Sequence, residues 1–154
     1  MGGRHRAYGF YIGDVALAAT ADIDNAAGNA CQGPVTVHLT MRLTNRHIGV
    51  AKDIQSGSCH FARVVAHYRH HAEADEAVFQ SYATKVAATL ESAPVSSLLG
   101  SAGAANPPDS ILKAAHAAIE PVLADMDAAR ISVRSNVDTP AEIKELTGSC
   151  DAEI

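Results

Sequence analysis

The chain has 154 residues and a formal net charge of −5, and 47% of its residues are apolar. About 30 of these apolar residues are alanine. Twelve basic residues against seventeen acidic ones leave no basic stripe for nucleic acid, and the longest apolar runs are far shorter than the ~20 residues of a membrane span. No signal peptide is visible at the start. The unusual feature of the composition is its eight histidines.

The first part of the chain predicts strands. Residues 8–23 mix aromatic, β-branched and glycine residues without a helical period, which predicts one or two short strands. Residues 24–33 are rich in Asn, Gly and Ala and predict a loop that contains Cys31. Apolar and polar residues alternate over 35–43, which predicts a strand with His38 on its exposed face. We expect a turn at 44–46 and a second strand over 47–54, so that residues 34–54 form a hairpin.

The middle of the chain predicts one long helix and a loop. Ser58 or Cys59 begins this helix, which extends to about Glu91 because apolar residues recur every three or four positions. The following residues, about 94–109, are rich in Ser, Gly, Ala and Pro and predict a flexible loop.

The last part of the chain predicts a second long helix from 108 to about 130, which Pro121 should kink or split. A short strand is expected over 131–135. The Thr-Pro-Ala-Glu sequence of 139–142 predicts the capped start of a short final helix that ends at Gly148. Together these elements predict a single α+β domain over residues 1–154. Its small antiparallel sheet packs on the long histidine-bearing helix, and the second long helix follows the flexible loop.

Four of the histidines lie within residues 59–71. His67 and His71 are four residues apart, so on a helix they are separated by about 40° around the axis and ~6 Å along it. Two imidazoles at this spacing can bind one zinc ion. His60 lies ~10 Å from His67 along the axis, and Asp75 about 12 Å, so neither can share that ion. The alternative interpretation is a solvated polar helix face.

The segment His67-Tyr68-Arg69-His70-His71 resembles the HExxH motif of zincins, most closely that of small bacterial, exported zincin-like metallopeptidases. The resemblance includes the preceding strand end at 48–54, the Ser-Gly-Ser-Cys sequence of 56–59, and the terminal Cys150 after a short helix. It covers about two thirds of the chain and implies a zincin-like fold with zinc as the cofactor.

Tyr68 stands where this family has the glutamate that acts as general base. Because a tyrosine has a reference pKa near 10, it is a poor base at neutral pH. The resemblance therefore implies the fold more strongly than the activity, and no catalytic residue is assigned. It also implies a third metal ligand from a later helix, for which His116 and Glu120 are candidates.

The three cysteines, Cys31, Cys59 and Cys150, lack the C-x-x-C spacing of zinc ribbons and thioredoxin-like sites. In a secreted or periplasmic protein, which is the location we predict, Cys59 can pair with Cys31 or with Cys150. In a cytoplasmic protein all three would be reduced thiols.

Three functions remain open at this stage. The first is a degenerate zincin-like domain that keeps a metal-binding His67/His71 pair but lacks efficient peptidase activity. The second is an active zinc-dependent peptidase or amidase that uses another base. The third is a structural or self-assembling protein that reuses the fold and binds a peptide, a protein or a second copy of itself.

Overall fold

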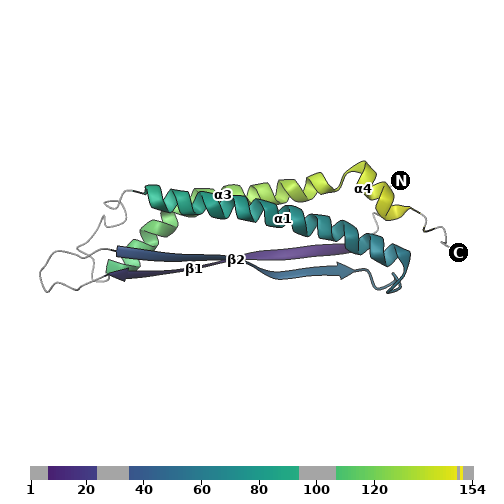
Figure 1. The fold of residues 1–154 in the computed structure, drawn as a ribbon, viewed down its shortest axis with the longest axis horizontal. Coiled ribbons are helices and arrows are strands. Elements are labelled where there is room, and N and C mark those ends of the chain that lie inside the picture. The colour runs from purple at the N-terminus through teal and green to yellow at the C-terminus, as the bar shows by residue number, and fades with distance from the viewer. Residues whose placement is uncertain (1–6, 24–34, 94–106, 149, 151–154) are drawn as a thin grey trace, which may run out of the picture. The chain divides into compact units, whose positions relative to one another are not determined.

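A computed structural model describes residues 7–23, 35–93, 107–148 and 150. Two strands and three helices follow in chain order: β1 (Gly9–Ile23), β2 (Val35–Val50), α1 (Cys59–Ser92), α3 (Pro107–Val137) and α4 (Pro140–Thr147). β1 and β2 form a two-stranded antiparallel sheet with α1 along one face (Figure 1), which confirms the predicted α+β architecture. Within the described ranges, no helix is both long enough and apolar enough for a membrane crossing.

The chain forms two compact units, each assembled from segments that are distant in sequence. The first unit comprises Met1–Asp14, Leu43–Phe79 and Ala128–Ile154, and the second comprises Val15–Arg42 and Gln80–Asp127. Each of the long elements is therefore divided between the two units, with one part in each: β1, β2, α1 and α3.

β2 continues without reversal through residues 44–46, so the hairpin predicted within residues 34–54 is wrong. Asn45 adopts a left-handed backbone conformation with φ of 51°, which explains why this segment has the composition of a turn. Instead of closing a turn, its side-chain amide donates to the Asp14 carboxylate of β1 at 2.8 Å. The partner of β2 is β1, and β2 ends at Val50.

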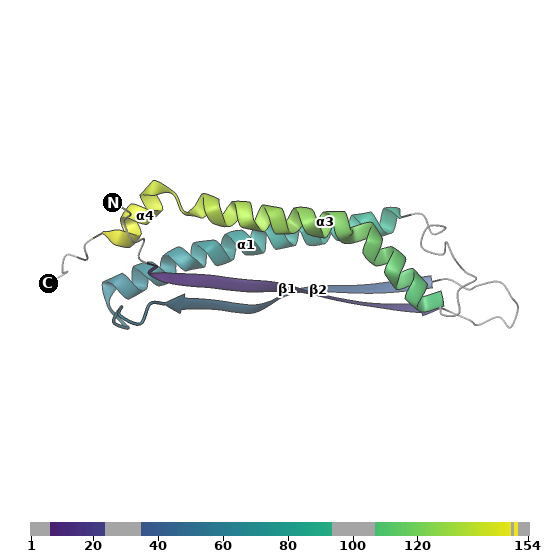
Figure 2. The same ribbon diagram turned by 180° about the vertical axis from the view of Figure 1, so that it is seen from behind.

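α3 continues through Pro121 and through residues 131–135, so the predicted split and the predicted short strand are both wrong. The helix axis bends in its first half (Figure 2), which agrees with the kink expected from a proline inside a helix. Residues 131–135 are helical because the less exposed side chains in this part of α3 recur at intervals of three or four residues. Arg130 is buried while Ile131 is exposed, and the Ser135 hydroxyl donates to the Ile131 carbonyl at 3.2 Å, four residues back.

The two units differ in what they bury. Among the described residues, the buried side chains of the second unit are all apolar: Val86 on α1, and Ile111, Ala115, Ile119 and Met126 on α3. The first unit instead buries four polar side chains together with three apolar ones. The polar set is His67, His71, Asp75 and Arg130, and the apolar set is Val64, Phe79 and Leu146.

Asp75 is fully buried and is surrounded by donors from two other elements. Arg130 of α3 donates to its two oxygens at 2.7 and 3.0 Å. Arg134 donates at 3.3 Å and the Tyr11 hydroxyl at 3.0 Å. Burial raises the pKa of Asp75, but the hydrogen bonds and charge of Arg130, supported by the other two donors, outweigh burial and lower the pKa below its ordinary value. Because Arg130 also donates to the Gly13 carbonyl at 2.6 Å, this group joins α1, α3 and β1.

Asp75→Asn should lower the free energy of unfolding by about 3 kcal/mol or more, because it leaves the buried Arg130 charge without its counter-ion. The matched control is Glu76→Gln on the next residue, which removes an exposed ion pair with Arg46 at 2.9 Å. That change should cost less than about 1 kcal/mol. Urea denaturation of the two variants and the parent measures both values, and equal losses would contradict a structural role of the buried pair.

The same pair should make stability depend on pH below the ordinary pKa of aspartate, 3.8. Because the pKa of Asp75 is lower in the folded state, its stabilising contribution is fully present above that value and disappears as the pH falls through the folded-state pKa. The unfolding midpoint of the parent should therefore decrease more steeply in this acid range than that of Asp75→Asn. Parallel curves for the two proteins would contradict this assignment.

Candidate metal centre

α1 presents two buried histidines toward the interior of the first unit. Ser58 caps the helix, since its hydroxyl oxygen accepts the Phe61 N–H at 3.1 Å. His67 and His71 follow on one face and are only 4% and 6% exposed. The interpretation of this pair as part of a solvated polar face is therefore wrong. It holds for the neighbouring His70, which is exposed.

The junction of α3 and α4 supplies a carboxylate to the same place. The Thr139 N–H donates to the Val137 carbonyl at 2.8 Å, so Asp138 lies at the centre of a tight three-residue turn. Thr139 then caps α4 by accepting the Glu142 N–H at 3.2 Å, with Pro140 at the first helical position. This confirms the predicted start of the final helix and fixes Asp138 against α1.

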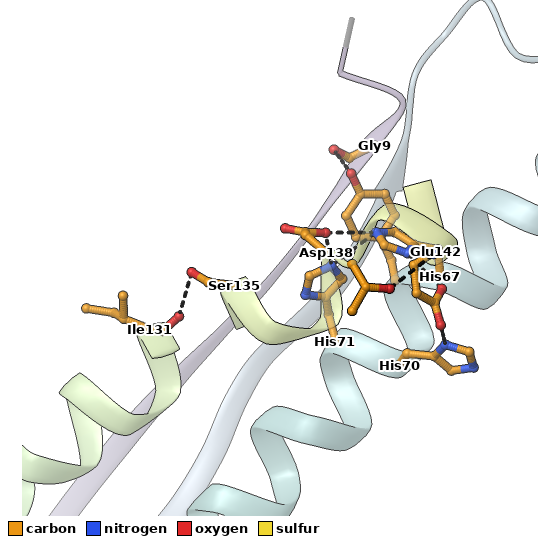
Figure 3. A network of polar contacts seen from close by, with 10 residues as sticks. Gly9, His67, His70, His71, Ile131, Ser135, Asp138 and Glu142 are labelled. Atoms are coloured by element: carbon orange, nitrogen blue, oxygen red, sulfur yellow. Dashed lines mark hydrogen bonds and ion pairs between the residues drawn. The ribbon is translucent and has the colours of Figure 1, made fainter. Parts of the chain in front are cut away.

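Three ligand atoms meet in a nearly equilateral triangle (Figure 3). The Nε2 atoms of His67 and His71 are 3.1 Å apart, and the Asp138 Oδ1 lies 3.2 Å from the first and 3.1 Å from the second. Their side chains come from α1 and from the α3–α4 turn and point toward one common centre. These three residues form a group that could hold a metal ion.

Hydrogen bonds alone cannot account for all three contacts. Each Nε2 carries at most one hydrogen, directed in the plane of its ring, and the Asp138 carboxylate carries none when ionised. If both nitrogens were protonated, their hydrogens would clash along the 3.1 Å contact. A cation at the centre would instead accept a lone pair from each of the three atoms.

The size of the triangle fits a first-row metal ion. With bonds of about 2.0–2.1 Å, the donors of a tetrahedral zinc ion lie about 3.3–3.4 Å apart. The observed edges of 3.1–3.2 Å are only slightly shorter. The Asp138 side chain is 49% exposed, which leaves one side of the group open to solvent.

Glu142, in the first turn of α4, orients His67 from the other ring nitrogen. Its Oε2 lies 3.4 Å from His67 Nδ1, and its Oε1 lies 3.3 Å from His70 Nδ1. The hydrogen bond from His67 lowers the pKa of Glu142, against the opposing effect of burial and with help from His70. A carboxylate at Nδ1 holds the proton there, so the Nε2 lone pair faces the other two ligand atoms.

The protonation of His71 also favours metal binding. Burial lowers the pKa of His71, and the neighbouring His67 and Arg134 act in the same direction, while Asp138 opposes them. Together these effects lower the pKa of His71 below the ordinary value for histidine, so the neutral imidazole is favoured at neutral pH. A neutral imidazole is the form that binds metal.

Tyr68 has a structural contact in place of a base function. Its hydroxyl donates to the Gly9 carbonyl of β1 at 2.7 Å. Burial raises its pKa, and the negative charge of Asp138 raises it further. The ring stacks on His71 with centroids 5.5 Å apart and meets His67 edge-on at 5.0 Å. Tyr68 therefore packs against the histidine pair and ties it to the sheet.

The other predicted site residues lie elsewhere. His116 and Glu120 are both exposed on the part of α3 that belongs to the second unit. His60 contacts the Tyr8 ring at a centroid distance of 5.3 Å and is not in the ligand group. Asp75, excluded from the pair by its distance along the helix, binds arginines instead.

The structure contains a disulfide between Cys59 and Cys150, one of the two pairings expected. It joins the first residue of α1 to Cys150, which lies shortly after the end of α4 at Thr147. Cys31, the other expected partner, lies outside the described residues.

Sequence reasoning missed two of the four side chains at this centre. Glu142 was identified only as a capping residue, whereas its carboxylate contacts two histidines of α1. Asp138 carries no signal beyond being an acidic residue directly before a helix cap. Its partners are 67 and 71 residues away, so local spacing does not reveal them.

Comparisons of the chain with models of known protein families, with curated proteins and with solved structures gave no match. The residues and their geometry are therefore the basis for interpreting the function.

Proposed function

We propose that this protein is a metal-binding domain in which His67, His71 and Asp138 hold one zinc ion, and that it is a degenerate zincin-like protein without efficient peptidase activity. The observation that supports metal binding most strongly is the triangle of ligand atoms with edges of 3.1–3.2 Å. It combines two buried imidazoles with one carboxylate, and these are ligands that zinc commonly takes in proteins.

The charge around the group also favours a divalent cation. Asp138 and Glu142 bring two carboxylate groups to the two imidazole rings. A divalent ion would balance these charges and would join α1 to the α3–α4 junction. Two histidines and one carboxylate are also the ligand set of ferrous oxygenases, so the identity of the ion is part of the test.

The absence of a suitable base supports the second half of the proposal. Tyr68 occupies the position of the zincin glutamate, and its hydroxyl is directed to the Gly9 carbonyl. Glu142 is the nearest alternative acid, but it contacts His67 at Nδ1, the ring nitrogen that does not face the ligand group. A general base must reach the proton that it removes, and neither side chain is placed for that.

The disulfide supports the proposal that the protein is secreted or periplasmic, because disulfides persist mainly in oxidising compartments.

Zinc titration by calorimetry should give one site per chain. His67→Ala and Asp138→Ala should each weaken binding by at least about tenfold, since each removes one of three ligands. The matched controls are His116→Ala and Glu120→Ala, which remove exposed side chains of α3 and should leave the affinity unchanged. Elemental analysis of the purified protein identifies the ion that it carries.

An unchanged affinity in Asp138→Ala together with a loss in Glu120→Ala or His116→Ala would replace Asp138 by the ligand predicted from the sequence. The absence of any binding of zinc or ferrous iron would refute the metal site itself.

Peptide hydrolysis by the zinc-loaded protein should equal that of His67→Ala, because neither Tyr68 nor Glu142 is placed to take a proton from a nucleophilic water. Tyr68→Glu supplies a carboxylate at the family position and should raise hydrolysis in a manner that depends on His67. Cleavage of a fluorogenic peptide library measures both effects. Strong hydrolysis by the unmodified protein that is lost in His67→Ala would show that it is an active zinc peptidase.

A further inference from the structure

The disulfide and the candidate metal centre hold the same short segment against α1. Asp138, Glu142 and Cys150 all lie after the end of α3 at Val137, and Cys59 is the first residue of α1. The covalent bond therefore closes one end of the segment onto the helix, while the carboxylates meet the histidines at the other end.

Two further features of the described residues affect how this segment is held against α1. α4 has eight residues and one buried side chain, Leu146. Arg63 of α1 donates to the Glu145 carbonyl at 3.4 Å, a long hydrogen bond. Isolated helices shorter than about 12 residues are marginal in water, so α4 depends on tertiary contacts. The disulfide is thus one of the contacts that hold α4, and with it the segment that begins at Asp138, against α1.

The disulfide is also accessible to a small thiol. Cys59 is exposed, and it lines a cavity of about 410 Å³ between α1 and α4 together with Arg63, His67 and Glu142. This volume suits a small molecule. Arg63 lies one helical turn after Cys59 and brings a positive charge to the cavity, which Glu142 and Glu145 also line. A guanidinium close to the disulfide stabilises a cysteine thiolate as leaving group.

From these contacts, and on the basis of the proposed function, we infer that the Cys59–Cys150 disulfide is a thiol-exchange site that controls the metal affinity of the His67/His71/Asp138 group. The reductant is a small thiol such as a cysteine-containing peptide. Its thiolate attacks one sulfur of the disulfide, forms a mixed disulfide and releases the other cysteine as a thiolate. A second thiol then attacks the mixed disulfide, so that two thiols are oxidised to one disulfide while Cys59 and Cys150 are reduced.

Reduction frees the Cys150 end of the segment, whose other end carries Asp138 and Glu142. Metal binding must then order a segment that the disulfide no longer holds. This ordering costs conformational entropy, so the metal affinity decreases. Thermodynamic linkage requires the reverse effect of equal size, so bound metal must protect the disulfide against reduction. One coupling therefore predicts two independent measurements.

The first measurement is the zinc affinity of the oxidised protein and of Cys59→Ser/Cys150→Ser. The double variant should bind zinc at least about tenfold more weakly, within the usual range of coupling between sites. Cys31→Ser, which leaves the pair intact, is the matched control and should bind like the parent. Equal affinity in the double variant would overturn the inference, whereas no binding to the oxidised parent would refute the metal site instead.

The second measurement uses only folded, oxidised protein and so does not depend on the folding of the double variant. The fraction of reduced Cys59–Cys150 is followed by thiol alkylation and mass spectrometry in glutathione buffers, with saturating zinc or with a chelator. Zinc should shift the equilibrium toward the disulfide by the same factor of at least about ten. Asp138→Ala, which lacks one ligand but keeps the disulfide, should show only the shift caused by zinc bound to glutathione, and the parent is compared with it. An equal shift in both proteins, or none in the parent, would overturn the inference.

Discussion

The first unit depends on one constraint, which is that α1 buries three polar side chains along one face of the helix. We call this row of residues the polar stripe. His67, His71 and Asp75 are spaced by four residues and lie between the apolar Val64 and Phe79. A buried polar group is costly unless it is paired, so each of these three residues requires a partner from another element. The positions of β1, of the end of α3 and of α4 all follow from this requirement.

The two ends of the polar stripe have partners of opposite charge. Asp75 lies among arginines, with Arg130 and Arg134 contributing two positive charges to one negative charge. The histidine pair lies among carboxylates, with Asp138 and Glu142 contributing two negative charges. At the arginine end, the two guanidinium groups donate directly to the Asp75 carboxylate. The histidine end has three ligand atoms that converge and an excess of negative charge, so it is the end at which a cation fits.

Local sequence patterns predicted the elements whose signals are local. The three- and four-residue period of α1, the cap formed by Thr139 and Pro140, and the His67/His71 spacing each depend on residues close together in the chain. The apolar period did not indicate that His67 and His71 are buried, because their partners arrive from the α3–α4 junction. β2 was divided at Asn45 because a left-handed residue in a continuous strand has the same composition as a turn. Asp138 and Glu142 could not be assigned, since their contacts with α1 depend on how α3 returns along it.

The contact between Tyr68 and Gly9 has a consequence for the residues that these two positions can hold. A Cβ at position 9 would collide with the Gly49 carbonyl and would lie 2.7 Å from the Tyr68 ring, so the tyrosine and the glycine are mutually adjusted. A glutamate at position 68 would remove the hydroxyl that binds the Gly9 carbonyl. Any activity gained by Tyr68→Glu is therefore accompanied by a loss of fold stability. A larger residue at position 9 would displace the tyrosine ring, so each of the two residues restricts what the other position can hold.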